Sequence, residues 1–292
     1  MVSLRDSRLR QLELRMRIPT RLALPIIALC VFVLSDTASA RFLLPHRAVY
    51  DMRLIKASDG SGIVYVRGRM IYEFYGSACL DYTTNTRIVT RIDSVTTSEL
   101  TDQQTTTFEA ADGNTFSFLT KTYVDQALQK DVRGTATREG QNVMVRLEKP
   151  VHKDFDIGST QFPTQHILDM MNRADAGQTL YETRLFDGAG DADKAMTTSV
   201  LIGKKAEAEK NDPEAPVLDK LEKDSAWPIE VAYFDDSMEG GDELPQTIIN
   251  FKLHDSGITR DVVVDYSNYS LSGKLVKLEL LDMKSGVCDK QQ

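Results

Sequence analysis

Four histidines are the most obvious candidates for chemistry, and none stands in a pattern that binds metal or drives hydrolysis. They are His46, His152, His166 and His254. None belongs to an H-E-x-x-H or H-x-H pair, and no cysteine cluster offers a zinc site. The sequence also lacks a G-x-S-x-G nucleophile elbow and a glycine-rich phosphate loop. The residues therefore predict no catalytic residue, no metal site and no cofactor, and we expect a protein that is not an enzyme.

One acidic loop resembles a calcium site in part. Asp187, Asp191 and Asp193 stand at relative positions 1, 5 and 7 of a glycine-containing segment. A calcium loop would also need a carboxylate at position 3 and a glutamate at position 12, where this chain has Thr198. The mismatch favours a solvated loop between two strands.

The first 40 residues have the pattern of a secretory signal peptide. Basic residues precede an apolar stretch at 22–34, whose 13 residues suit a signal and fall short of the roughly 20 that a membrane-spanning helix needs. Ala40 ends a small-x-small cleavage motif, so cleavage before Arg41 is expected. Translation could start at Met1 or at Met16. We expect an exported chain without a stable membrane anchor, in which residues 41–292 form a single domain.

Export determines which cysteines remain in the mature chain and places them in an oxidising compartment. Cys30 would leave with the signal peptide, which leaves Cys79 and Cys288. Two thiols in an oxidising compartment usually pair where the geometry allows it. A catalytic pair would normally be spaced C-x-x-C. The spacing therefore predicts a structural disulfide between positions 209 apart in the sequence.

Charge excludes one class of partner. The signal segment contains six arginines and three acidic residues, so its removal changes the formal net charge from −8 to −11. An acidic domain is poorly suited to bind nucleic acid or anionic headgroups through its overall charge. The sequence therefore predicts no nucleic-acid partner.

Alternating apolar and polar residues dominate the mature chain. In the run from Ala48 to Leu54 every second residue is apolar, and thirteen such runs extend to about residue 283. Turn sequences separate many of them, among them Asp59-Gly60 and Ser272-Gly273. Short strands joined by such turns form an antiparallel meander. A dozen or more strands would leave long exposed edges unless the sheet curled, which favours an open barrel-like or spiral sheet.

Two segments depart from this pattern. Residues 162–171 predict one short helix, with Pro163 in its first turn and Gly177 beyond its end. Its apolar side must be buried, and the interior of a curled sheet would bury it. Residues 204–224 are charged and contain two prolines, which predicts a surface excursion with a short helix near 217–223.

Aromatic residues on the strands suggest a binding surface. If the sheet curls, they could line an apolar groove for an acyl chain or an extended peptide. The alternative is an ordinary filled core, and alternation alone does not separate the two. The residues expected at the groove are Tyr72, Phe74, Phe116, Phe118, Trp227 and Tyr233.

Several segments, in order along the mature chain, resemble the exported EipB cell-envelope integrity family of Gram-negative bacteria. They are residues 44–51, 68–74, 76–79, 162–166 and 226–234, together with Cys288. One departure is Leu80-Asp81, where a glycine before the tyrosine is expected.

The resemblance implies a periplasmic β-spiral that is similar in shape to lipoprotein carriers. It also implies that Cys79 and Cys288 correspond to the family's two disulfide cysteines. The implied role is to maintain envelope integrity, as a scaffold or as a binder of lipid, lipoprotein or an envelope protein. The family has no established catalytic residues to transfer. The alternative is a hydrolase of envelope material, which would need a histidine beside a serine or aspartate in one pocket.

Overall fold

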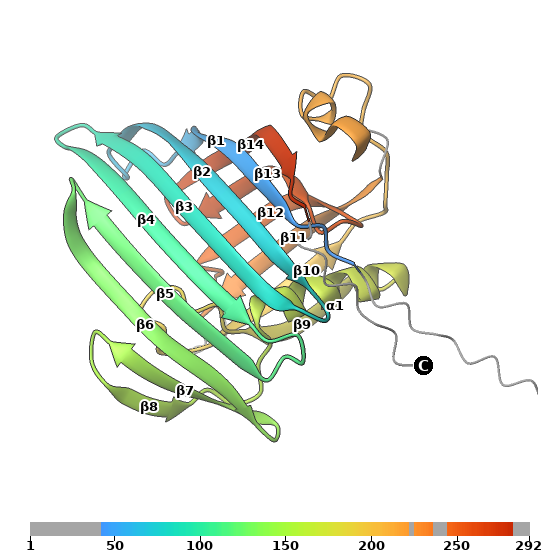
Figure 1. Ribbon diagram of the computed structural model, residues 1–292. Coiled ribbons are helices and arrows are strands. Elements are labelled where there is room, and N and C mark those ends of the chain that lie inside the picture. Colours follow the sequence, from blue (N-terminus) through green and yellow to red (C-terminus); the bar gives the residue numbers. More distant parts are fainter. Residues whose placement is uncertain (1–41, 222–224, 236–243, 283–292) are drawn as a thin grey trace, which may run out of the picture. The chain divides into compact units, whose positions relative to one another are not determined.

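The computed structural model describes residues 42–221, 225–235 and 244–282 (Figure 1). The chain divides into two units, Met1–Ser39 and Ala40–Gln292. The predicted signal peptide and its cleavage site before Arg41 lie outside the described residues and stay predictions. The rest of this description concerns the second unit.

Among the residues that the structure describes, fourteen strands make up most of the second unit. The first seven are β1 (His46–Ala57), β2 (Ile63–Ser77), β3 (Asp81–Ser94), β4 (Ser98–Glu109), β5 (Thr115–Val124), β6 (Ala127–Glu139) and β7 (Asn142–Lys149). The others are β8 (Lys153–Asp156), β9 (Leu180–Leu185), β10 (Met196–Ile202), β11 (Ala226–Phe234), β12 (Thr247–His254), β13 (Thr259–Tyr266) and β14 (Tyr269–Leu280). The predicted mainly β fold is confirmed. The sequence missed only the short edge strand β8.

All fourteen strands belong to one antiparallel sheet, in the order β8-β7-β6-β5-β4-β3-β2-β1-β14-β13-β12-β11-β10-β9. Every pair except β1–β14 joins strands that follow one another in the sequence, as a meander of hairpins requires. Side chains of β2 and β3 share a buried cluster with side chains of β10, β11 and β12. These strands are far apart in the sheet order, so the sheet curls. We call the side that faces these clusters the inner face.

One predicted turn is wrong. Ser272 and Gly273 lie inside β14, where they pair with Arg53 and Met52 of β1. The glycine is there because of a close approach: a Cβ at this position would lie 2.9 Å from the Sδ of Met52. The actual turn before β14 joins Tyr266 to Tyr269.

The helix α1 (Pro163–Asp175), the one α-helix within the described ranges, confirms the predicted helix. Pro163 occupies its first turn, where the missing N–H costs no hydrogen bond. Gly177 has a φ of 72°, which ends the helix in the left-handed region. The helix lies between β8 and β9 in the sequence, so it connects the two edge strands of the sheet.

The segment 204–221, which we call the strap, is only partly a surface excursion. It contains a short 3-10 helix, η1 (Ala215–Leu221), broken by a kink at Asp219. Contrary to the sequence-based expectation, Glu214 and Leu218 are buried at 2% exposure each. Leu218 packs on the inner face against side chains of β1 and β14, including Tyr50 and Leu275.

Candidate functional site

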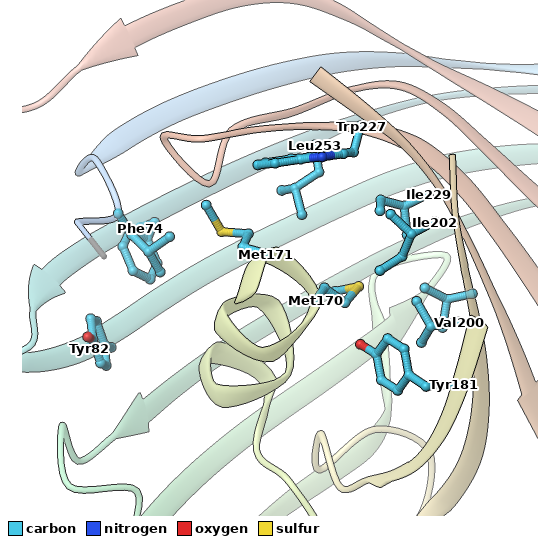
Figure 2. Close-up of a cluster of buried hydrophobic side chains, with 12 residues drawn as sticks. Phe74, Tyr82, Met170, Met171, Tyr181, Val200, Ile202, Trp227, Ile229 and Leu253 are labelled. Carbon is cyan, nitrogen blue, oxygen red and sulfur yellow. The ribbon is translucent and has the colours of Figure 1, made fainter. Parts of the chain in front are cut away.

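One end of the inner face is filled by α1. Met170 and Met171 point from the helix into an apolar cluster (Figure 2). The cluster contains side chains from six strands, among them Phe74, Tyr82, Tyr181, Val200, Trp227 and Leu253. Met171 is fully buried. The unbranched methionines fill the irregular space between the two sides of the curled sheet.

A buried carboxylate fixes the start of α1. The two oxygens of Glu109, at the end of β4, accept hydrogen bonds from the backbone N–H groups of Thr164 and Gln165, at 2.7 and 3.0 Å. Arg138 of β6 donates to the Gln165 side chain at 3.2 Å and to the carbonyl of Gly113. Burial raises the pKa of Glu109, against the opposing effect of these N–H groups and of Arg138. The helix is therefore attached to the β4–β5 end of the sheet.

A second part of the inner face is filled by the segment between β9 and β10. Phe186 packs edge-on against Phe116 and Phe118 of β5, with ring centroids 6.1 and 5.6 Å apart. Gly188 follows with a φ of 68°, and a Cβ there would lie 2.6 Å from the ring of Phe118. A larger residue could not lie so close to the ring.

The six residues predicted to line a groove lie in these two filled regions. Phe74 and Trp227 belong to the cluster around α1, with Tyr72 and Tyr233 packed against it. Phe116 and Phe118 belong to the cluster around Phe186. The recess beside Tyr72 and Phe74 has a volume of about 10 Å³, the space of one water molecule. A ligand groove at these six residues stays a prediction.

A third part of the inner face has a different character. Facing the same way as Glu109, β3, β4 and β5 present a set of threonines in register across the three strands. Most are only partly buried, unlike the apolar residues of the same face nearer α1. Thr105 and Thr120 are within hydrogen-bond distance, at 3.1 Å. We call this set the threonine face; its members are Thr84, Thr86, Thr90, Thr101, Thr105, Thr107, Thr120 and Thr122.

Apolar side chains lie beside and across from the threonine face. Met70 of β2 is paired with Ile88 of β3, and both lie at the same level of the sheet as the threonine face. On β12 and β13, Ile249, Phe251 and Val264 face inward and are only partly buried. The uncovered inner face thus combines hydroxyl groups with apolar surface. It was not predicted from the sequence, although Thr101, Thr105 and Thr107 stand on one face of a strand, with Gln103 between the first two, and were a visible signal.

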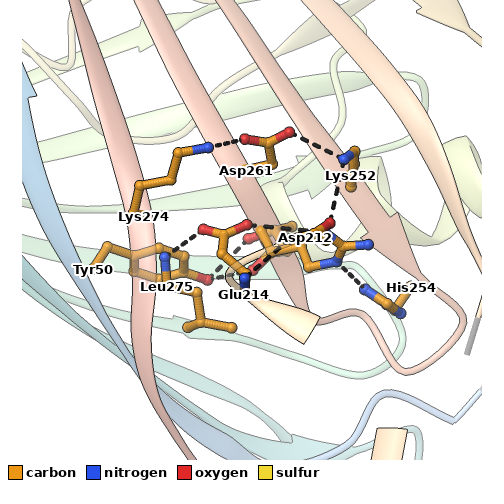
Figure 3. Close-up of polar contacts among 10 residues, drawn as sticks. Tyr50, Asp212, Glu214, Lys252, His254, Asp261, Lys274 and Leu275 are labelled. Carbon is orange, nitrogen blue, oxygen red and sulfur yellow. Dashed lines mark hydrogen bonds and ion pairs between the residues drawn. The ribbon is translucent and has the colours of Figure 1, made fainter. Parts of the chain in front are cut away.

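A charged cluster attaches the strap to the sheet (Figure 3). Arg260 of β13 is 1% exposed, pairs with Asp212 of the strap and lies 3.9 Å from Glu214. Its Nε donates to the Nε2 of His254 at 3.0 Å. Because that nitrogen accepts, the imidazole is neutral, and burial together with the Arg260 charge lowers the pKa of His254 to about 4.

Glu214 takes the place of a missing strand contact. The pairing of β13 with β14 stops at Val262–Gly273, although β14 continues. Beyond that point the N–H of Leu275 donates to the Glu214 carboxylate at 2.6 Å. The strap therefore satisfies a backbone group that the sheet leaves unpaired. Burial raises the pKa of Glu214.

The remaining histidines do not form a catalytic arrangement. His46 and Ser256 line the same 10 Å³ recess, but no hydrogen bond joins their side chains among the described residues. The His46 Nδ1 instead lies 2.7 Å from the Leu44 carbonyl. His166 lies on α1 with Nδ1 3.1 Å from Gln161, and burial lowers its pKa to about 4. His152 is exposed.

Metal and membrane signals are absent from the part of the chain that the structure describes. No three His, Cys, Asp or Glu side chains gather there in a way that could hold a metal ion. No helix within the same ranges is long and apolar enough to cross a bilayer. In the acidic loop, Asp187 accepts a hydrogen bond from Ala189 of its own loop, and Asp191 pairs with Lys130.

Only one of the two cysteines of the predicted disulfide lies among the described residues. Cys79 lies in the exposed turn between β2 and β3. Cys288 lies outside the described residues. The pairing of the two cysteines therefore stays a prediction.

Comparisons with known proteins identify the relatives of this fold. A curated protein of Brucella abortus named "Cell envelope integrity protein EipB" is 49% identical over 249 residues, which cover 85% of this chain and 88% of the relative. A crystal structure described as a β-barrel-like protein of a domain of unknown function, also from Brucella abortus, matches with a TM-score of 0.80 and 49% identity. The match covers 83% of this chain and all of that one. The sequence model of the family described as EipB-like matches residues 37–282, and the chain belongs to this family.

Proposed function

We propose that this chain helps to maintain the cell envelope from the periplasm, as a non-enzymatic protein that binds an envelope lipid or lipoprotein. The envelope role is supported by the 49% identical relative named for cell envelope integrity. Export by a signal peptide cleaved before Arg41 would bring the chain to the periplasm. A disulfide between Cys79 and Cys288 would be stable in that compartment.

The observation that carries the binding role is the part of the inner face that none of the covering segments reaches. Other parts are covered by α1, by the segment after β9 and by the strap, each of which packs into its own apolar cluster. The threonine face and the apolar side chains beside it stay partly exposed. An acyl chain would lie against Met70, Ile88 and Phe251. Its polar end would meet threonine hydroxyls, which can donate and accept hydrogen bonds.

A charged residue on the inner face should block this binding. We expect freshly purified mature protein to carry lipid in native mass spectrometry, and to bind a fluorescent long-chain fatty acid after delipidation. Ile88→Lys places an ammonium group on the inner face, and we expect affinity for the fatty acid to fall at least tenfold. The adjacent Val89 faces the opposite side of β3, so Val89→Lys is the matched control and should bind normally.

Two outcomes would contradict the proposal. One is repeated absence of lipid from the native protein combined with no fatty-acid binding. The other is equal binding by Ile88→Lys and wild type when circular dichroism shows both to be folded. A scaffold that uses only its outer surface would give both results.

A further inference from the structure

The end of the sheet remote from α1 carries a concentration of exposed apolar side chains. Four hairpin turns meet there: 58–62, 95–97, 125–126 and 267–268 (Figure 1). We call this end the hairpin rim. Seven large hydrophobic residues within three positions of these turns are at least 40% exposed, and Val95 reaches 76%. They are Ile55, Val64, Tyr65, Val95, Leu100, Leu128 and Tyr266.

Neighbouring hairpins of the rim are joined through their backbones. The N–H of Ser58 donates to the carbonyl of Asn268, that of Val95 to Gly62 and that of Asp125 to Leu100, each at 2.9 Å. These bonds satisfy backbone groups at the tips of the turns without water. A surface that enters lipid must meet this requirement, because an unpaired N–H or C=O in hydrocarbon costs several kcal/mol.

Acidic residues predominate near the rim. Within three positions of the four turns Lys56 is basic, whereas Asp59, Asp93, Glu99, Asp125 and Asp265 are acidic. Such a surface has no electrostatic attraction to an anionic membrane. Aliphatic residues and tyrosine can instead enter the boundary between headgroups and acyl chains through burial of apolar area.

The rim lies at the end of the inner face that is remote from α1. Rows of the sheet that contain Glu109 and Phe116 lie next to α1, whereas rows with Thr90, Thr101 and Ile92 lie next to the rim turns. A lipid on the threonine face could therefore pass to or from a bilayer at this end. The opposite end is occupied by α1.

We infer that the hairpin rim docks on the surface of a phospholipid bilayer, by shallow insertion of its apolar tips. The inference rests on the proposed function, since a lipid ligand supplies the reason for contact with a bilayer. Docking driven by apolar area should occur on zwitterionic lipid and should change little with salt.

Flotation with phosphatidylcholine vesicles tests the inference on the mature protein. We expect wild type to float with the vesicles at low and high salt. The double variant Val95→Asp/Leu128→Asp should lose at least tenfold in partition. The matched control is Leu80→Asp in the β2–β3 turn at the α1 end, because Leu80 and Leu128 are exposed to 50% and 51%. The control should float like wild type.

Three results would overturn the inference. The first is wild-type protein that binds fatty acid in solution but does not float, which leaves the proposed function intact. The second is equal loss in Leu80→Asp, which would mean unspecific adsorption. The third is a change of oligomeric state in the rim variant by analytical ultracentrifugation, which would make a second copy of the chain the occupant. Flotation without any fatty-acid binding would instead contradict the proposed function and leave the docking in place.

Discussion

Replacing Arg260 with methionine should destabilise the fold far more than removing any surface charge. The guanidinium is 1% exposed and lies between Asp212 and Glu214 of the strap and His254 of β12. Methionine fills a similar length but leaves the buried Asp212 carboxylate with only Lys252, whose Nζ lies 3.6 Å away on a side chain that is 31% exposed. Removing one member of a buried ion pair typically costs about 3–5 kcal/mol, because the remaining charge is desolvated and uncompensated. We expect Arg260→Met to lower the free energy of unfolding by that amount.

A surface pair provides the control. Arg91 and Asp93 form an ion pair at 3.0 Å, but the Arg91 side chain is 60% exposed. Arg91→Met should therefore cost less than about 1 kcal/mol. Urea unfolding at neutral pH measures both variants. The fluorescence of Trp227, the single tryptophan, reports on the transition because its side chain is buried.

A triple variant separates charge from packing. Arg260→Met combined with Asp212→Asn and Glu214→Gln removes the uncompensated charges and keeps the side-chain volumes. We expect it to recover much of the stability lost in the single variant. If Arg260→Met were no more costly than Arg91→Met, the strap would not depend on this cluster and the reasoning would be refuted.

Three further predictions address the disulfide, the histidines and the helix. Reductant should slow the mature protein on a denaturing gel and lower its melting temperature. If Cys79 and Cys288 close so long a loop, the free energy of unfolding should fall by up to about 5 kcal/mol. Unchanged mobility and an unchanged melting temperature would exclude the pairing. Burial lowers the pKa of His166 from 6.5 to about 4, so its stabilising contribution is complete above pH 6.5 and is lost as the pH falls towards 4. Wild type should therefore lose about 2 kcal/mol more than His166→Asn between pH 7 and pH 5, and parallel pH profiles would contradict this. Met171→Ala should cost about 2–5 kcal/mol through the cavity it leaves, whereas exposed Asn172→Ala on the same helix should cost almost nothing.

Local sequence patterns predicted most of the fold. Alternation located thirteen of the strands because each has one buried face, and turn residues separated them. The helix was visible from Pro163, Gly177 and its apolar residues between them. The Ser272-Gly273 turn was misplaced because glycine also serves where two strands approach closely, and only the pairing with Met52 reveals that reason.

The strap shows what local patterns could not reveal. Its charges and prolines predict exposure, since an unpaired carboxylate is rarely buried. Glu214 is nevertheless buried, because Arg260 and the N–H of Leu275 lie next to it in space and far from it in sequence. The environment of a charge in a sheet that curls depends on strands that are distant in the chain.

The threonine face can be explained by solvation alone or by ligand binding, and the two explanations differ in what they require. Threonine suits a strand and tolerates water, so an uncovered inner face would favour it even without a ligand. Solvation alone, however, gives no reason for Met70, Ile88, Phe251 and Val264 to stay partly exposed on the same face. The segments that cover the rest of this face, α1 and the strap, contribute apolar residues to each cluster they meet. A ligand that is apolar along its length and polar at one end would complete the uncovered part in the same way.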